Sequence, residues 1–503
     1  MGYNSRMETT EPRNLDDAAC YQALRTRDAR FDGRFFTAVL STGIYCRPVC
    51  PARTPKRENV RFYAYAAAAQ EAGFRPCLRC RPETSPGSTP WLGTTTTVSR
   101  ALRLIADGAL DSEAVGALAA RLGVGERHLR RLFLRHLGTT PRTLGQTRRL
   151  AFAKKLIDET RLPVGTVAAA AGFRSLRRFH TAFRQAYRQP PRALRRRSAL
   201  SPRDSSSDLT LRLPFRPPFD WDGVLRFLSA RAVPGLEAAA HGRYRRSLRI
   251  GEQQALVQIE PVRGEHHLLA RIRLADATLL LQVVERLRRL FDLDADPEAI
   301  ARHLRRDPRL APRLRRRPGV RLPGSGDPFE AAVRAILGQQ VSVAAATRLV
   351  ARLAERHGEP LSLDQSGMEE IRFVFPSPQR LAAADPAGFG CPRARGETLV
   401  RFARAVADGR ISFQPASLSA FVESLCALPG VGPWTAHTVA LRALGEPDAF
   451  PAGDLGLRRA LGSAGRLATP RHVEAAAESW RPWRAYAAMT LWNGGSTHAD
   501  AKH

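Results

Sequence analysis

The sequence predicts a multidomain protein with three parts: a small cysteine-rich α+β domain, an all-α domain with a tandem repeat, and a mostly helical α+β domain that begins with an antiparallel sheet. Three observations predict this organisation. The 503 residues suffice for about three or four domains. Stretches rich in Ser, Pro and Thr at 82–97 and 198–208 separate segments with different apolar patterns and predict linkers. A hydrophobic content of 44% excludes a disordered basic tail. Beyond a polar tail at 1–15, we expect domains at 16–83, 98–197 and 209–497.

The charge balance points to a polyanionic partner. Lys and Arg number 79 against 47 Asp and Glu, a formal net charge of +32, and such an excess is typical of proteins that bind nucleic acid. Only four of these cations are lysines. The arginine bias has two explanations: coding composition, or bidentate contacts with phosphate and bases. No apolar run approaches the ~18 residues of a membrane span, and no secretory signal is present. We therefore expect a cytoplasmic protein without membrane contacts.

Four of the seven cysteines form two close pairs in domain 16–83. The pairs are C-x3-C and C-x2-C, separated by 26 residues: Cys46, Cys50, Cys77 and Cys80. Two such pairs brought together by a small fold make the tetrahedral thiolate cage of a zinc site. A strand-like run at 60–63 and an alanine-rich helix ending at Gly73 fill the gap. Seven unevenly placed cysteines do not fit a secreted disulfide framework.

Domain 98–197 carries an internal repeat with an offset of about 50 residues, at which Phe133 recurs as Phe183. Each copy has a small-residue helix, a glycine turn (Gly123 or Gly172) and an arginine-rich amphipathic helix, which is the order of a helix-turn-helix. The basic positions expected to contact DNA are Arg127, Arg130, Arg174 and Arg177. One copy alone would fit any helical hairpin. Two in tandem favour binding of double-stranded DNA over helix packing alone.

The third domain begins with strands and continues as helices. Runs of alternating apolar residues between glycine turns predict an antiparallel meander at 244–250, 254–260 and 267–274. From Leu279 onward the periodicity is helical to near the end of the sequence. We therefore expect a sheet subdomain at 209–285 and a helical subdomain at 286–497.

A two-glycine motif lies in this helical part, where residues 428–436 read LPGVGPWTA. Gly430 and Gly432 permit a tight turn between two helices, whose second N-terminus offers free N–H groups to a DNA phosphate. A cation, monovalent or other, is often bound there. Such a helix-hairpin-helix also occurs in polymerases and helicases. Asp454 follows Gly432 by 22 residues, after a helix and a proline-containing loop, and this pairing favours base excision.

The first two domains resemble the Ada family of adaptive-response regulators. The matching segments are TGIYCRPVC at 42–50, RENV at 57–60 and GFRPCLRC at 73–80, and the tandem repeat resembles the AraC-type segment that follows in Ada. The resemblance implies that all four cysteines bind one zinc ion and that Cys46 accepts a methyl group from DNA methylphosphotriesters. It also implies a transcriptional activator, with RNA polymerase as a partner. A purely structural zinc ribbon is the alternative. No Pro-Cys-His-Arg active site is present, so we expect no alkylguanine methyltransferase activity.

The third domain resembles the AlkA family of DNA-3-methyladenine glycosylases II. The matching segments, besides the hairpin, are PFDW at 218–221, LFDL at 290–293, AVRAILGQQVSV at 332–343 and WRPWR at 480–484. The resemblance implies that Asp454 is the catalytic carboxylate and that Trp434 and Trp492 are aromatic faces of the base pocket. Gln340 stands where the family places an apolar wedge that fills the gap left by the flipped nucleotide. We interpret Trp480 and Trp483 as core residues.

The sequence thus predicts a bifunctional response to DNA alkylation: methyl transfer to Cys46, and hydrolysis of the N-glycosidic bond of alkylated purines such as 3-methyladenine. The indole faces favour a cationic base, and Asp454 stabilises the oxocarbenium ion and orients water. Trp434 occupies the position of the lyase lysine, so we expect no strand nicking. No four-cysteine loop is present, so we expect no iron–sulfur cluster. The alternative is a transcription regulator whose C-terminal domain binds DNA without excising bases.

Overall fold

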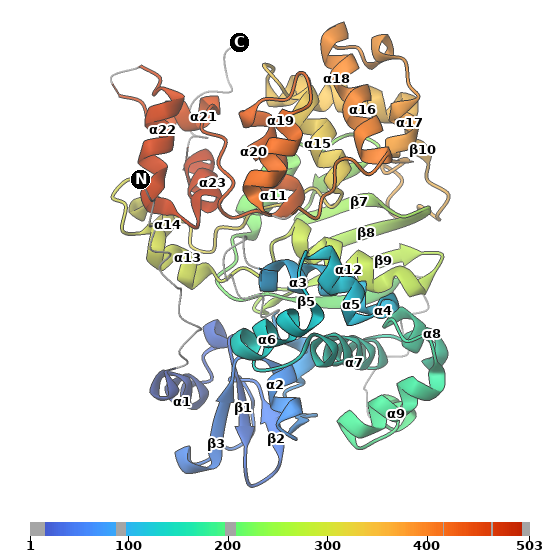
Figure 1. Ribbon diagram of the computed structural model, residues 1–503, viewed down its shortest axis with the longest axis vertical. Coiled ribbons are helices and arrows are strands. Elements are labelled where there is room, and N and C mark those ends of the chain that lie inside the picture. The colour runs from blue at the N-terminus through green and yellow to red at the C-terminus, as the bar shows by residue number, and fades with distance from the viewer. Residues whose placement is uncertain (1–15, 87–96, 197–207, 416, 464–465, 495–503) are drawn as a thin grey trace. The chain divides into compact units, whose positions relative to one another are not determined.

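The computed structural model divides into two compact units (Figure 1). Unit 1 comprises residues 1–155 and 172–193, and unit 2 comprises residues 156–171 and 194–503. The structure describes residues 16–86, 97–196, 208–415, 417–463 and 466–494. The predicted polar tail and most of both predicted linkers lie outside these residues. Within them, no helix combines the length and apolar character needed to cross a membrane.

The cysteine-rich part of unit 1 is a four-stranded sheet with two helices. The strand order is β3-β1-β2-β4, in which β1 is antiparallel to β2 and β3 while β2 is parallel to β4. The elements are α1 (Asp17–Thr26), β1 (Phe36–Val39), β2 (Ile44–Cys46), β3 (Val60–Tyr63), α2 (Ala66–Glu71) and β4 (Arg75–Pro76). The strand predicted at 60–63 and the helix predicted before Gly73 are both confirmed. Phe36, Ala38 and Tyr45 of the sheet pack against Ala69 of α2.

The segment 97–196 is entirely helical, as its apolar pattern predicts. Its helices are α3 (Thr97–Ala106), α4 (Ala109–Ser112), α5 (Val115–Arg121), α6 (Glu126–Leu137), α7 (Pro141–Glu159), α8 (Val164–Ala170), α9 (Leu176–Tyr187) and α10 (Pro191–Arg196). Between α5 and α6, Gly123 adopts a φ of +72°, which favours glycine. Leu129 and Phe133 of α6 pack in one core with Leu118 of α5 and with Tyr65 and Ala68 of the cysteine-rich part. Unit 1 therefore joins its metal-binding sheet and first helix-turn-helix through a shared apolar core.

From Leu209 onward, unit 2 contains a five-stranded antiparallel sheet of order β5-β9-β8-β7-β6. Its strands are β5 (Leu209–Pro214), β6 (Glu237–Ala240), β7 (Arg243–Ile250), β8 (Gln253–Pro261) and β9 (His267–Leu274). The predicted meander corresponds to β7, β8 and β9, which lie side by side in Figure 1. The edge strands β5 and β6 were absent from the prediction, because β6 is short and alanine-rich and β5 pairs with a strand about 60 residues away.

The remainder of unit 2 is mostly helical, as predicted. Its helices are α11 (Trp221–Ser229), α12 (Leu280–Leu290), α13 (Pro297–Leu304), α14 (Ala311–Arg316), α15 (Pro328–Leu337), α16 (Val343–His357), α17 (Pro378–Ala382), α18 (Arg393–Ala407), α19 (Leu418–Cys426), α20 (Pro433–Leu444), α21 (Leu455–Ala460), α22 (Pro470–Ala477) and α23 (Arg484–Gly494). A two-residue strand pair, β10 (Glu359–Pro360) with β11 (Phe373–Val374), interrupts the helices. Helical periodicity does not reveal so short a pair.

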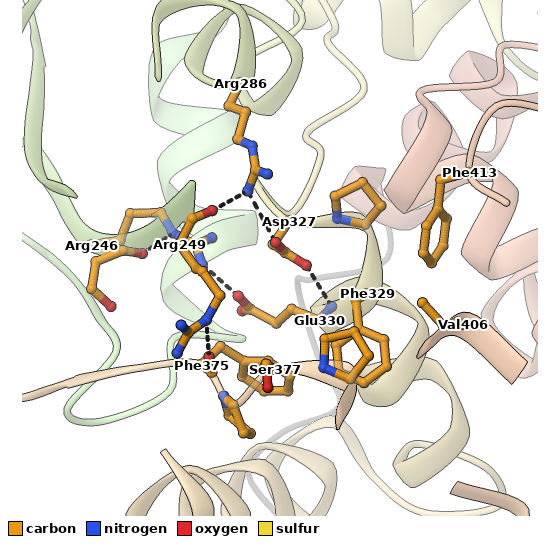
Figure 2. A pocket seen from close by; sticks show the side chains of 14 residues that line it. Arg246, Arg249, Arg286, Asp327, Phe329, Glu330, Phe375, Ser377, Val406 and Phe413 are labelled. Carbon is orange, nitrogen blue, oxygen red and sulfur yellow. Dashed lines mark hydrogen bonds and ion pairs between the residues drawn. The ribbon is translucent and has the colours of Figure 1, made fainter. Parts of the chain in front are cut away.

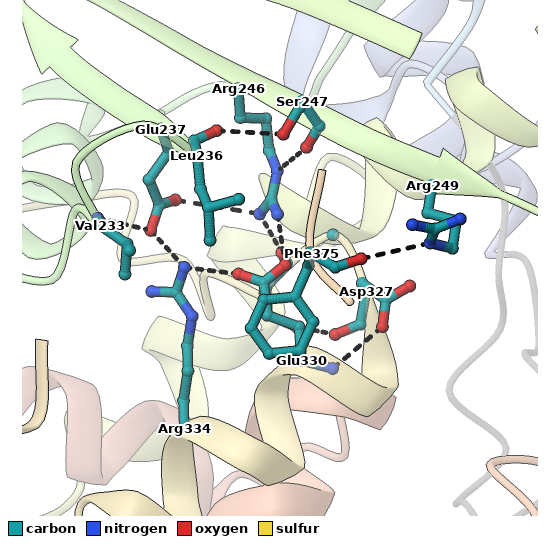
Figure 3. Close-up of polar contacts among 12 residues, drawn as sticks. Val233, Leu236, Glu237, Arg246, Ser247, Arg249, Asp327, Glu330, Arg334 and Phe375 are labelled. Carbon is teal, nitrogen blue, oxygen red and sulfur yellow. Dashed lines mark hydrogen bonds and ion pairs between the residues drawn. The ribbon is translucent and has the colours of Figure 1, made fainter. Parts of the chain in front are cut away.

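Buried ion pairs fix α15 against the sheet. Figure 3 shows Arg246 of β7 beside Glu330 of α15, with Nη2 and Oε2 2.6 Å apart. Arg334, one turn along α15, pairs with Glu330 and with Glu237 of β6. Removing one partner of such a buried pair is costly, because the other charge is left unpaired. The network therefore holds α15 in one position relative to the sheet.

The N-terminus of α15 is held by a second set of contacts, around a small cavity of about 290 Å³ (Figure 2). Asp327 caps the helix by accepting from the backbone N–H of Glu330 at 3.0 Å. Arg286 donates to Asp327 at 3.0 Å and to the carbonyl of Arg249 at 2.7 Å. With both its start and one face fixed, α15 holds the turn that follows it, with Gln339 and Gln340, in a defined place.

Candidate functional site

The four predicted metal ligands converge in unit 1. The sulfur atoms of Cys46, Cys50, Cys77 and Cys80 all lie within 4.8 Å of one another. A tetrahedral zinc ion with Zn–S bonds of about 2.3 Å needs sulfur separations of about 3.8 Å, so the cage fits zinc. The sheet brings the two pairs together, because β2 ends at Cys46 and its parallel neighbour β4 ends just before Cys77.

The four sulfurs differ in their hydrogen bonds. The backbone N–H of Arg47 donates to Sγ of Cys80 at 3.3 Å. The backbone N–H of Ala52 forms a hydrogen bond with the sulfur of Cys50, and the backbone N–H of Cys80 forms one with the sulfur of Cys77. Among the described residues, no N–H group is placed to donate to Sγ of Cys46. The printed backbone hydrogen bonds thus distinguish Sγ of Cys46 from the other three sulfurs, and the role of Cys46 as the nucleophile stays a prediction.

The side chain of Arg47, next to Cys46, is largely buried and is held by hydrogen bonds within unit 1. Its Nε donates to Asp32 at 2.9 Å, and its Nη1 donates to Thr84 at 2.7 Å and to the carbonyl of Cys80 at 3.2 Å. Both side chains of the Arg47–Asp32 pair are largely buried. From its place beside Cys46 in the sequence, a phosphate-binding role would be expected for Arg47, but the structure gives it a structural one.

A chain of polar contacts runs from the cage strand to the helices of unit 1. Tyr45, which precedes Cys46 on β2, accepts a hydrogen bond from Gln70 of α2 at 2.9 Å. The amide oxygen of Gln70 accepts a hydrogen bond from the hydroxyl of Thr147 on α7 at 2.7 Å. Tyr45 and Thr147 are both buried. Residues around the cage are therefore connected to α7, the helix that follows the first helix-turn-helix.

The four arginines expected to contact DNA are all exposed. Arg127 and Arg130 lie on α6, Arg177 lies on α9, and Arg174 precedes the N-cap residue of α9, Ser175. In α6 the opposite face is buried through Leu129 and Phe133, so the basic face is free for a ligand. DNA contact by these four residues stays a prediction.

The helix-hairpin-helix forms between α19 and α20. Gly430 has a φ of +90°, and a Cβ there would collide with the side chain of Thr398 on α18, so only glycine fits. Thr398 donates to the carbonyl of Pro429 at 3.2 Å and thereby anchors the turn. Gly432 caps α20, with no side-chain hydrogen bond and with open space around it. The first turn of α20 therefore offers its backbone N–H groups to an anion.

A cavity of about 1200 Å³ opens beside this hairpin and brings together the predicted glycosylase residues. Asp454, Trp434, Trp492 and Gln340 all line it, as does Gly430. Asp454 comes from the N-terminus of α21, Trp434 from α20, Trp492 from α23 and Gln340 from the turn between α15 and α16. These segments span more than 150 residues of sequence, so the cavity exists only in the folded unit.

Two hydrogen bonds orient the carboxylate of Asp454. Its Oδ1 accepts from the backbone N–H of Leu457 at 3.0 Å and from the indole N–H of Trp492 at 2.8 Å. Among the described residues, Oδ2 has no hydrogen-bond partner, so it is free to act in the cavity. Gly456 makes room for this contact, because a Cβ there would lie 3.0 Å from Asp454 and 3.1 Å from Trp492. Trp492 is therefore more than an aromatic face: it positions the carboxylate.

Gln340 adopts a φ of +54° and is exposed at the rim of the cavity. Its neighbour Gln339 donates to the carbonyl of Gly430 at 2.9 Å and to the hydroxyl of Thr435 at 3.0 Å. Gln339 thus ties the loop that carries Gln340 to the helix-hairpin-helix. The sequence offered no signal for this contact, since the partners are about 90 residues apart.

Four arginines also line the cavity, and none of them was expected there from the sequence: Arg231, Arg334, Arg442 and Arg459. In an arginine-rich chain, composition does not distinguish them from surface residues. Trp480 and Trp483 do not line the cavity and are buried in the core, as interpreted. The indole of Trp480 donates to Asp307 at 2.7 Å.

Comparison with known families covers the same regions. Residues 19–83 match the metal binding domain of Ada, 118–197 a helix-turn-helix domain, 210–327 the AlkA N-terminal domain and 333–485 the HhH-GPD superfamily of base excision DNA repair proteins. The probable bifunctional transcriptional activator/DNA repair enzyme AlkA of Mycobacterium tuberculosis is 45% identical over 95% of this chain and 96% of its own length. The chain belongs to this bifunctional AlkA family.

Two further relatives each match one part of the bifunctional AlkA chain. DNA-3-methyladenine glycosylase 2 of Escherichia coli is 38% identical over 56% of this chain and 95% of its own length. The bifunctional transcriptional activator/DNA repair enzyme Ada of Escherichia coli is 42% identical over 26% of this chain and 36% of its own length. The resemblances to Ada and AlkA stated from the sequence are thus confirmed.

Proposed function

We propose that this chain responds to DNA alkylation by two chemistries. In unit 1, Cys46 accepts methyl groups from DNA methylphosphotriesters, and the methylated protein activates transcription. In unit 2, alkylated purines such as 3-methyladenine are released by hydrolysis of the N-glycosidic bond. The observation that carries the second activity is the meeting of Asp454, Trp434 and Trp492 in one cavity beside the hairpin. The observation that supports methyl transfer is the convergence of the four cysteine sulfurs in unit 1.

Methyl transfer uses the unshielded sulfur of the cage. A bound zinc ion keeps the four thiols deprotonated at neutral pH. The Cys46 thiolate attacks the methyl carbon of the triester, a C–S bond forms, and the C–O bond breaks with its electron pair on the phosphate oxygen. The products are a thioether on Cys46 and an ordinary phosphodiester. Because nothing regenerates the thiolate, the transfer is stoichiometric.

Methylation lowers the negative charge of the cage from −2 to −1. This weakens its repulsion of the DNA backbone, so we expect tighter promoter binding by the exposed arginines of α6 and α9. The contacts of Gln70 with Tyr45 and Thr147 give the cage a direct connection to α7. RNA polymerase is the proposed partner of the activated form, and the cytoplasm, at the nucleoid, is the proposed location.

Base excision begins with extrusion of the damaged nucleotide, a step that is least costly for a base that pairs poorly. The hairpin N–H groups, with or without a cation, hold the backbone, and Gln340 fills the gap in the duplex. The face of Trp434 contacts the base. Oδ2 of Asp454 stabilises the oxocarbenium ion and orients the attacking water. Trp434 offers no amine for a Schiff base, so we propose a hydrolase without lyase activity.

The test is an assay of both reactions on methylated DNA. The wild-type protein should release free 3-methyladenine and take up radiolabelled methyl groups on Cys46, without nicking the abasic product. Promoter affinity at matched salt should rise on methylation. Cys46→Ala should abolish methyl uptake and keep excision. Equal promoter affinity before and after methylation would contradict the switch.

The alternative function is that of a regulator that binds DNA through unit 2 without excision. In that case methylated DNA should release no 3-methyladenine at any protein concentration. The free Oδ2 of Asp454 inside a cavity disfavours it, because DNA binding alone has no use for a carboxylate there.

A further inference from the structure

A strongly basic segment of unit 2 lies outside the base cavity. Residues 302–317, which include the end of α13 and all of α14, contain eight arginines and one carboxylate, that of Asp307. The whole chain has 79 basic and 47 acidic residues, so the excess of positive charge is far greater in this segment. Six of the eight arginines are exposed and are called the α13–α14 basic surface below: Arg302, Arg305, Arg306, Arg309, Arg315 and Arg316.

Most charges of this surface have no carboxylate partner. Within the described parts of the chain, only Arg309 of the six forms an ion pair, and its partner is Asp307. Two exposed arginines of α18 differ, since Glu397 pairs with both Arg393 and Arg401. Coding composition explains why arginine is common in this chain, but it does not explain why carboxylates are missing beside these arginines. Like charges on one surface repel each other, and binding of a polyanion relieves this repulsion.

The fold holds the basic surface in a fixed arrangement. The opposite face of the segment is buried through three leucines: Leu304, Leu310 and Leu314. The segment is also attached to the short helix Glu478–Trp480. Nε2 of His303 lies 3.1 Å from the carbonyl oxygen of Ser479, and the indole N–H of Trp480 donates to Asp307 at 2.7 Å. Because the backbone of the segment is already ordered, a ligand of the arginines has only their side chains to immobilise.

The basic surface and the base cavity are separate sites. All of residues 302–317 are described, and none of them lines the cavity. The contact with Trp480 precedes α23, whereas Trp492 of the cavity lies eight residues after the first residue of that helix, about 12 Å along the helix axis. Loss of charge from the basic surface should therefore leave the chemistry at Asp454 unchanged.

We propose that the α13–α14 basic surface is a second binding site for double-stranded DNA in unit 2, where arginines contact phosphate groups without reading the base sequence. Guanidinium groups bind phosphate oxygens with paired N–H donors, and DNA carries one negative charge per about 1.7 Å of its axis. No large apolar side chain is exposed among residues 302–317. A protein partner needs an apolar centre, and a membrane surface needs apolar side chains to insert, so the chemistry of this surface favours DNA.

This inference goes beyond the proposed function, because binding of undamaged DNA does not require excision. The test variant, made in the full-length protein, replaces three arginines of the basic surface: Arg305→Gln, Arg306→Gln and Arg316→Gln. The matched control replaces three arginines that are also exposed, form no ion pair among the described residues and do not line the cavity: Arg226→Gln, Arg263→Gln and Arg380→Gln. These control residues lie on separate elements, so they form no common surface.

Affinity for an undamaged duplex of mixed sequence is measured between about 50 and 200 mM salt. Each phosphate contact contributes about 0.9 to the slope of log affinity against log salt concentration. The slope should therefore fall by about two to three in the test variant, and the affinity at low salt should fall about tenfold or more. The control variant should keep a slope close to that of the wild-type protein.

Chemical protection locates the contact without any substitution. Phenylglyoxal modifies accessible guanidinium groups, and mass spectrometry of the wild-type protein reports each arginine separately. An undamaged duplex should protect the basic surface from modification and should leave the three control arginines reactive. This measurement remains decisive if the test variant does not fold.

Equal salt slopes in the test and control variants, or unprotected arginines on the basic surface, would overturn the proposal. Protection by polyglutamate or by vesicles of anionic lipid to the same extent as by DNA of equal charge would contradict DNA as the ligand. Single-turnover release of 3-methyladenine should be the same in both variants, and a loss confined to the test variant would show that the two sites are not separate. If the wild-type protein releases no 3-methyladenine, the proposed excision is wrong, whereas the binding and protection results still decide this site.

Discussion

The cysteine cage of unit 1 and the base cavity of unit 2 are built in opposite ways. The cage takes all its ligands from 35 residues at adjacent strand ends, and one backbone N–H group forms a hydrogen bond with each of three of its four sulfurs. The cavity takes its residues from segments between Phe227 and Trp492, and arginine side chains and the side chain of Asp454 are part of its lining. A site formed by neighbouring residues is thus specified by their spacing in the sequence, whereas a site formed by distant segments is specified by packing and charge balance.

Removal of zinc should give the largest difference between the two sites. A structural zinc site contributes on the order of 10 kcal/mol to the fold of a small domain. A strong chelator should therefore unfold the cysteine-rich part and abolish methyl uptake, while excision persists. Five of the six tryptophans lie in unit 2, so tryptophan fluorescence should report an unchanged unfolding transition for that unit. Loss of excision together with zinc would show that the two sites depend on each other.

Asp454→Asn should have the next largest effect. The change keeps the shape of the side chain and removes the charge that, in the proposed mechanism, faces the oxocarbenium ion. Loss of such an electrostatic group costs on the order of a hundredfold or more in rate. Single-turnover release of 3-methyladenine should collapse, while methyl uptake by Cys46 proceeds at the wild-type rate. Near-normal excision would mean that the carboxylate has no part in the chemistry.

Trp492→Phe tests whether the indole N–H of Trp492 positions the carboxylate of Asp454. Phenylalanine keeps an aromatic face and lacks the N–H that holds Oδ1 of Asp454 at 2.8 Å. A hydrogen bond to a charged group contributes about 1.5–3 kcal/mol, so we expect a loss of about tenfold or more in the rate of excision. The affinity for DNA with an abasic site should change little. If affinity falls and the single-turnover rate does not, Trp492 binds the base and does not position the carboxylate.

The smallest effect concerns acidic pH. His437 of α20 accepts from the backbone N–H of Phe450 in the loop that leads to Asp454. Burial, with Arg484 and Arg481, lowers the pKa of His437 to about 4, against the effect of Asp448. The folded state therefore favours the neutral form of His437. The stability that this preference gives to the folded state is fully present above about pH 6.5 and is lost as the pH falls toward 4.

When the pH falls from 7.5 to 5.5, protonation of His437 in the unfolded state should lower the free energy of unfolding of unit 2 by about 1 kcal/mol. Urea unfolding followed by tryptophan fluorescence at the two values measures it. His437→Asn, which cannot be protonated in this range, should lose correspondingly less stability between them. An identical pH dependence in the variant would show that other groups govern acid sensitivity.

Particular residues show how far the sequence led. The spacing of the four cysteines, the two-glycine hairpin and the distance from Gly432 to Asp454 predicted groups that the structure brings together. The helix-turn-helix repeat and the strands β7, β8 and β9 were also predictable, because their periodicity is local. The pairing of β5 with β9, the short β10–β11 pair and the contact of Gln339 with Gly430 were not, since each joins residues far apart in the chain.

The chemistry of the chain is therefore predictable from local spacings, because thiolate ligands, a hairpin with two glycines and a following aspartate restrict the residue types at fixed positions. Which of these groups have free atoms depends on the folded protein. Among the described residues, it left Oδ2 of Asp454 without a hydrogen-bond partner, and it left Arg231 and Arg442 packed on the ring of Phe227 without an ion pair. Hydrogen-bond satisfaction and charge neutralisation depend on neighbours in space, which a linear pattern of residues does not contain.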